Sequence, residues 1–148
     1  MLDPKNDSID DIGPVGSTLL TRLGGGIMMV AALLTALAGA LIMLTSVIYT
    51  PWMKPAPYAM LGLGILGMPF AAGIMNARDW AAIGGVFLMG GIALLNLVFN
   101  LWAAINRGFY SWSFFAMMAS LVGAVLVPLA IKDCLVASKN RRKLLEGV

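Results

Sequence analysis

Three glycines near the middle of the chain have the spacing of a phosphate-binding loop. In the stretch LGLGILGMP, Gly62, Gly64 and Gly67 fit the pattern G-x-G-x-x-G, in which the missing side chains let the backbone approach a dinucleotide's pyrophosphate. That chemistry also needs a strand before the glycines and a helix beginning at them, so that the phosphate meets the helix N-terminus. Here the glycines lie inside a long apolar run that reaches Pro69. We therefore expect no nucleotide site.

Side chains that bind metals or transfer protons are scarce in this sequence. It contains no His and one Cys, Cys134, so the chain alone lacks the usual ligand sets for zinc, haem or iron–sulfur clusters. The four apolar segments defined below contain no Asp, Glu, Lys or Arg in their interiors, which argues against a proton relay at membrane depth. We expect no enzyme activity, no catalytic residues, no metal and no cofactor.

Two amides, Asn96 and Asn100, lie deep in the third apolar segment. They are four residues apart and therefore share one face of a helix. Burying an unpaired amide in lipid is strongly unfavourable, so this face must point to protein, to a ligand or to water. Two interpretations stay open, namely hydrogen bonds between helices and the lining of a water-filled path.

The composition predicts a membrane protein. Of the 148 residues, 60% are hydrophobic and 11% are charged, whereas soluble domains are about a quarter charged. Cutting the chain at its charges and proline clusters leaves four apolar segments, at 24–49, 58–75, 80–105 and 110–131. Each is near the length of about 20 residues that crosses a hydrocarbon core. We predict an all-α fold, a polytopic helical membrane protein with four transmembrane helices in a small bundle.

The segments that flank the predicted transmembrane domain, 24–131, carry most of the charge and predict its orientation. The tail, 132–148, is basic directly after the last span, so the positive-inside rule makes it cytoplasmic. An even number of spans places the leader, 1–23, on the same side. This leader is acidic, unlike the basic start of a signal peptide. We expect both termini in the cytoplasm and the protein in a cell membrane, the bacterial cytoplasmic membrane.

Within the leader, Ser17 is a fair helix N-cap, and Leu19, Leu20 and Leu23 suit one short interfacial turn. Three consecutive glycines, 24–26, follow. Since glycine is conformationally permissive, we expect the chain to loosen there before the first span.

Small residues recur at helical spacing in every span and predict close helix packing. Helices in lipid approach one another most closely across Gly, Ala and Ser, because no hydrophobic drive brings them together there. The predicted packing residues are Gly62, Gly67, Ala71, Ala81, Gly85, Ala116, Ser120 and Ala124. The pattern does not identify which helices meet.

The tail contains the motif KNRRK, with Lys139, Arg141, Arg142 and Lys143. Such residues attract anionic lipid headgroups or an acidic partner, at about 1 kcal/mol per basic residue near a membrane surface. The net charge of the chain is only +3, and no folded basic surface accompanies the motif, so we expect no nucleic-acid partner.

These features favour a non-catalytic accessory or assembly subunit of a larger integral membrane complex. Its partners are then the lipid bilayer and other membrane-protein subunits, or further copies of itself. One alternative is a self-associating channel or facilitator lined by Asn96 and Asn100. Another is a holin-like protein, since the chain is similar to phage holins in its small size and basic tail. It resembles small multidrug transporters in span number only, because it lacks their acidic residue in the first span.

Overall fold

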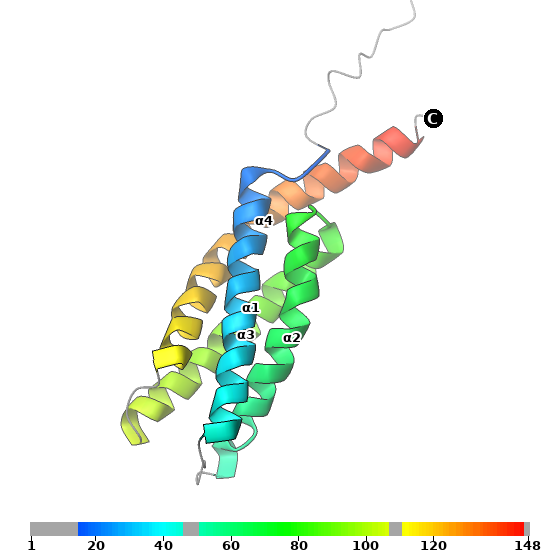
Figure 1. Cartoon of the computed structure of the whole chain (residues 1–148). Helices are drawn as coiled ribbons and strands as arrows, with labels where there is room; N and C mark the ends of the chain where they lie inside the picture. Colours follow the sequence, from blue (N-terminus) through cyan, green and yellow to red (C-terminus); the bar gives the residue numbers. More distant parts are fainter. Residues whose placement is uncertain (1–14, 46–50, 107–110, 147–148) are drawn as a thin grey trace, which may run out of the picture.

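The computed structural model describes residues 15–45, 51–106 and 111–146, and the regular structure in these ranges is entirely helical (Figure 1). The elements are α1 (Leu19–Thr45), the short 3-10 helix η2 (Pro51–Met53), α2 (Ala56–Met75), α3 (Asp79–Asn106) and α4 (Ser111–Glu146). Four helices are long and apolar enough to cross a membrane. The prediction of an all-α chain with four such helices is confirmed. The leader up to residue 14 and the ends of the predicted spans at 46–49 and 110 lie outside the described residues.

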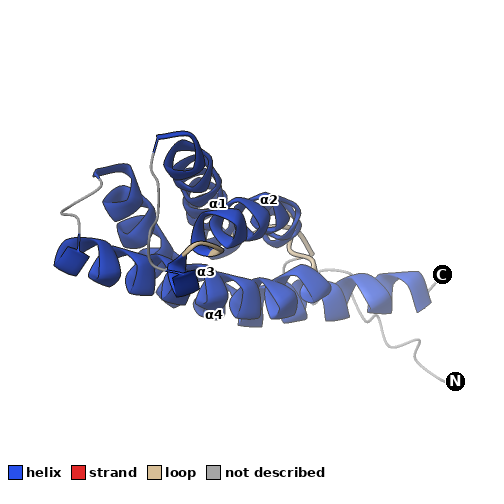
Figure 2. Cartoon of the chain, turned by 90° about the horizontal axis from the view of Figure 1, so that it is seen from below, coloured by secondary structure: helices blue, strands red, loops and turns tan. Residues whose placement is uncertain are grey.

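The four helices form a bundle in which each packs against two neighbours. α1 lies between α2 and α4, and α3 also contacts both of these helices, while α1 and α3 touch only slightly. The start of α1, the turn between α2 and α3, and the end of α4 lie at the same end of the bundle (Figures 1 and 2). We call this the tail end and the opposite one the far end.

The buried apolar core has two parts that follow one another along the bundle. Near the tail end the large buried residues are Met28, Ile74, Met89, Ile92 and Val127. Near the far end they are Ile42, Met60, Phe99 and Trp102. Many of the other buried residues are alanines and glycines. The backbones of neighbouring helices therefore lie close together, and dispersion contacts between the helices stabilise the bundle.

α1 begins at Leu19 and continues without interruption through the three glycines at 24–26. The sequence instead suggested one short turn that ends before these glycines, with a loosened chain at them. The Thr21 backbone N–H donates to Thr18 Oγ1 at 3.3 Å, so Thr18, and not Ser17, caps the helix. The three glycines stay helical, and neighbouring helices pack against the first two, Gly24 and Gly25. A Cβ added to Gly25 would lie 2.8 Å from the carbonyl oxygen of Ala71 on α2.

α4 continues through Glu146, well beyond the predicted end of the last span at 131. At about 1.5 Å per residue it is far longer than a hydrocarbon core of about 30 Å. We call residues 132–146 the α4 extension. It passes the tail ends of α1 and α2 and projects beyond them (Figure 1). The basic tail is therefore helical over its described length.

Candidate functional site

A buried polar cluster links three helices in the interior of the bundle. Asn96 on α3 is fully buried, and its Nδ2 donates to Thr35 Oγ1 on α1 at 2.9 Å and to the carbonyl oxygen of Ile92 at 3.0 Å. The Thr35 hydroxyl donates in turn to the carbonyl oxygen of Ala31 at 2.7 Å, so it accepts from Asn96. Asn96 thereby joins α3 to α1.

Asn100 makes the second link of this cluster, from α3 to the first turn of α4. It is 6% exposed, and Ser113 is 1% exposed. Asn100 Nδ2 donates to Ser113 Oγ at 2.9 Å, to the Ser113 carbonyl oxygen at 3.1 Å and to the Asn96 carbonyl oxygen at 2.8 Å. Both amides thus find partners inside the chain, which is the arrangement that the hydrogen-bonding interpretation requires.

One fully buried side-chain atom of the cluster has no hydrogen-bond partner among the described residues, namely Asn96 Oδ1. An unpaired buried polar atom costs about 1–3 kcal/mol, which offsets much of what a hydrogen bond contributes. The two asparagines are therefore unequal. Asn96 contributes less net stability than Asn100.

We expect Asn100→Ala to lower the free energy of unfolding more than Asn96→Ala does. Asn96→Ala should cost about 1 kcal/mol or less, the usual size of such bonds in membrane proteins, because it also removes the unpaired oxygen. Asn100→Ala removes a donor that serves three acceptors. Unfolding of both variants in one mild detergent tests the order. The reverse order would show that Asn96 Oδ1 has a partner.

The glycines of the G-x-G-x-x-G pattern lie inside α2, and no helix begins at them, so the geometry of a phosphate loop is absent. Gly64 and Gly67 instead face α1. A Cβ on Gly64 would lie 2.6 Å from both the Ala32 carbonyl oxygen and the Ala36 nitrogen, and one on Gly67 would lie 2.8 Å from Ala32 Cβ. Gly64 was not among the predicted packing residues, although its spacing of three to Gly67 and seven to Ala71 is a helical signal.

The predicted packing residues divide into buried and outward-facing groups. The buried ones are Gly67, Ala71, Ala81, Gly85, Ala116 and Ser120. A Cβ on Gly85 would lie 2.8 Å from Ile74 Cδ1 on α2. Ala124 is only partly buried, and Gly62 is exposed. A Cβ on Gly62 would meet nothing within 4 Å in the described part of the chain, so Gly62 differs from the expectation of packing between helices of this chain.

At the tail end, the basic residues of the α4 extension have unequal surroundings. Arg141 donates from Nη1 to the Val15 carbonyl oxygen at 3.2 Å and from Nη2 to the Ala77 carbonyl oxygen. It therefore makes internal contacts with the start of the described chain and with the turn between α2 and α3. Arg142 forms an ion pair with Asp79 at 3.4 Å. Lys139 and Lys143 are exposed.

Further polar contacts attach the α4 extension to the rest of the tail end. Ser138 Oγ donates to Asp79 Oδ2 at 2.9 Å, and Thr18 Oγ1 donates to Asp133 Oδ2. The extension is thereby joined to the start of α3 and to the cap of α1. These contacts hold three segments that are far apart in the sequence.

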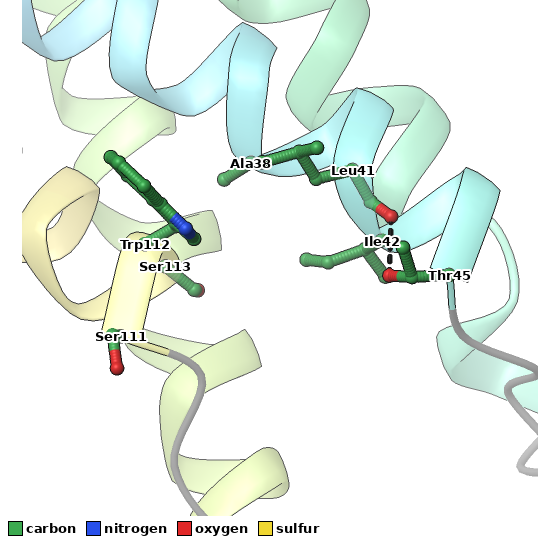
Figure 3. Close-up of a pocket in the computed structure, with 7 residues that line it drawn as sticks. All are labelled: Ala38, Leu41, Ile42, Thr45, Ser111, Trp112 and Ser113. Carbon is green, nitrogen blue, oxygen red and sulfur yellow. Dashed lines mark hydrogen bonds between the residues drawn. The ribbon is translucent and has the colours of Figure 1, made fainter.

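Hollows open between helices at both ends of the bundle. A crevice of about 230 Å³ lies at the far end between α1 and α4, lined by Ala38, Leu41, Ile42, Thr45, Ser111, Trp112 and Ser113. Figure 3 shows Trp112 and Ser113 facing the side chains of α1 across it. The described residues that line it supply hydroxyl and indole donors and include no titratable side chain, so they can bind polar groups but supply no acid or base.

A groove of about 630 Å³ lies at the tail end, between the first turns of α1 and the last turns of α2. It is lined by Ser17, Arg22, Met29, Ala72, Met75 and Asn76. Unlike the described lining of the crevice, the lining of this groove includes a positively charged side chain, that of Arg22.

Within the described ranges, no group of three or more His, Cys, Asp or Glu lies together in a way that could hold a metal. No protein-family model matches the chain, and neither a curated protein nor a solved structure is significantly similar to it.

Proposed function

We propose that this protein is a non-catalytic accessory or assembly subunit of a larger integral membrane complex. The observation that carries the proposal is the presence of glycines on the outer faces of the helices. A Cβ added to Gly62 on α2, or to Gly90 or Gly91 on α3, would meet nothing within 4 Å among the described residues. The inward-facing glycines have an evident role in packing, whereas these have none inside the chain.

An outward glycine is unfavourable unless something approaches it closely. Glycine in a helix interior is less favourable than alanine by about 1 kcal/mol. A lipid chain gains little from a bare backbone, but a second helix packs most closely there. Gly90 also lies between Phe87 and Leu94 on one face of α3, and these side chains are 77% and 64% exposed. Together they form a notch that suits a side chain of a neighbouring helix.

The interior of the bundle supports the same proposal. The buried amides are engaged within the chain, and no group of three or more His, Cys, Asp or Glu lies together among the described residues. We do not extend the proposal to a channel lined by Asn96 and Asn100, because side chains 0% and 6% exposed do not reach the surfaces where copies of the chain would meet. No observation favours a holin-like role.

The proposal includes the expected location, a cell membrane with both termini in the cytoplasm. The four long apolar helices are compatible with a multi-pass membrane protein. The basic residues at the tail end, by the positive-inside rule, favour the cytoplasm for that end.

We expect Gly90→Leu to remove partner subunits while leaving the fold of this chain intact. The leucine fills the notch, and it meets open space within the chain. Purification in mild detergent followed by native mass spectrometry measures partner retention. Val125→Leu is the matched control, because it adds apolar bulk to a side chain of α4 that is already 63% exposed. A wild-type chain that purifies as a clean monomer would contradict the proposal.

A further inference from the structure

The groove at the tail end has the size and layering of a binding site for an amphiphile. Its volume of about 630 Å³ falls within the range of roughly 300–1,000 Å³ that is usual for ligand pockets. α1 and α2 run in opposite directions, since Gly25 meets Ala71 and Gly39 meets Pro57. The start of α1 and the end of α2 therefore form one mouth.

Polar and apolar side chains are separated along this groove. Ser17, Arg22 and Asn76 lie at the mouth, and the other lining residues are apolar. Met29 lies two helical turns, about 10 Å, beyond Arg22 along α1, and Ala72 lies one turn from Asn76 along α2. A molecule with a polar head and an apolar chain would match this order if its long axis ran along the helices.

Arg22 makes the mouth specific for an anion. Its Nε donates to Ser17 Oγ at 3.0 Å, which orients the guanidinium, and its terminal nitrogens make no hydrogen bond to the described residues. No carboxylate is among the described residues that line the groove. A guanidinium with open terminal nitrogens is well suited to bind phosphate oxygens in pairs.

Gly26 lies along α1 between two lining residues of the groove and adds no side chain there. Gly26 lies one turn from both Arg22 and Met29, on the same face of α1. A Cβ added to Gly26 would meet nothing within 4 Å among the described residues, whereas one added to Gly25 would lie 2.8 Å from the Ala71 carbonyl oxygen. α1 and α2 therefore touch beneath the groove and leave space above Gly26. The flexible Met29 and Met75 can adapt to an irregular chain.

We propose that this groove binds one anionic phospholipid. The phosphate lies on Arg22 and Ser17, and an acyl chain lies along Gly26, Met29 and Ala72 between α1 and α2. The apolar wall distinguishes this ligand from free phosphate. The described lining residues include no carboxylate, so they offer no partner for the cationic headgroup of a zwitterionic lipid. The site is separate from the outward glycines and does not require a partner subunit.

Native mass spectrometry of the delipidated full chain, titrated with phosphatidylglycerol or phosphatidylcholine, tests this proposal. The wild type should bind one phosphatidylglycerol in preference to phosphatidylcholine. Arg22→Gln should weaken phosphatidylglycerol binding by about tenfold or more, because a charged hydrogen bond is lost. Gly26→Leu should abolish binding of the single lipid by filling the groove, while thermal unfolding stays unchanged.

Two matched variants serve as controls. Lys143→Gln removes the same charge from the α4 extension, and Gly90→Leu makes the same change at an open glycine of α3. Both should bind phosphatidylglycerol as the wild type does. Equal losses in Arg22→Gln and Lys143→Gln would show diffuse attraction to basic residues and overturn the proposal. Full competition by inorganic phosphate would also overturn the proposal. So would phosphatidylglycerol binding that appears only after Asp10 and Asp11 are changed to Asn, because the acidic leader would then be the occupant of the groove.

Discussion

Replacing Gly64 with leucine should destabilise the bundle by about 3 kcal/mol or more, the upper end of the range for overpacking. A Cβ at this position would lie 2.6 Å from two backbone atoms of α1, the Ala32 carbonyl oxygen and the Ala36 nitrogen. Backbone atoms cannot rotate away as a side chain does, so α1 and α2 must separate. That separation would also loosen the neighbouring close contact at Gly39, where a Cβ would lie 2.6 Å from the Pro57 carbonyl oxygen.

The matched control for this change is two residues away on the same helix. Gly62→Leu meets open space within the described chain, so the free energy of unfolding should stay within about 0.5 kcal/mol of the wild type. Thermal and denaturant unfolding of the purified monomer in one detergent measures both variants. Similar losses in the two would mean that α2 presents a different face to α1. A fully stable Gly64→Leu would mean that the two backbones are further apart.

Replacing Arg141 with glutamine should lower the free energy of unfolding by about 2 kcal/mol and release the α4 extension. The guanidinium donates to the carbonyl oxygens of Val15 and Ala77, and hydrogen bonds from a charged group contribute about 1.5–3 kcal/mol. Ala77 is fully buried and lies in the turn after α2, with a φ of 50°. Among the described residues, Arg141 is the donor that the structure gives to this carbonyl oxygen, so its loss leaves a buried acceptor unpaired. Arg141→Lys should not keep the wild-type stability, because a lysine ammonium is a compact point charge and lacks the planar fork with which a guanidinium donates to two separate acceptors.

Limited proteolysis and thermal unfolding measure this loss. Trypsin should cut the α4 extension of Arg141→Gln sooner than that of the wild type, although one cleavage site has been removed. Arg142→Gln is the control, because the Arg142 side chain is 74% exposed in its ion pair with Asp79. Exposed ion pairs contribute about 0–1 kcal/mol. If Arg142→Gln were as destabilising as Arg141→Gln, the internal contacts of Arg141 would not be what holds the extension.

The sequence was sufficient for the four long apolar helices because hydropathy is a local property. Charged and proline-rich interruptions divide the chain in nearly the same places as the structure does, with α2 and α3 ending close to the predicted bounds. The ends of α1 and α4 were not predictable in this way. α1 runs through three glycines and α4 runs beyond 131, since contacts with other helices, such as those of Gly25 and Arg141, stabilise helix where local signals suggested an end.

The candidate packing residues were predicted less completely. Sequence spacing identified Gly67 and Gly85, which are buried, but it did not include Gly64, which packs against α1, and it did not show that Gly62 faces outward. A membrane helix is apolar on every side, so its sequence lacks the polar face that marks the outside of a soluble helix. Only the position of α1 decided that Gly64 is a contact and that Gly62 faces outward.

The sequence by itself also determined that Asn96 and Asn100 need partners, since a bare amide in lipid is too unfavourable to persist. Only the tertiary structure decided that Thr35 and Ser113 supply them. The same holds for Arg141 and for the groove at Arg22, which are formed by residues from different helices. Hydrophobicity along the chain fixes which segments become helices, but hydrogen-bond partners, close backbone contacts and grooves arise between segments, so they depend on how the helices pack.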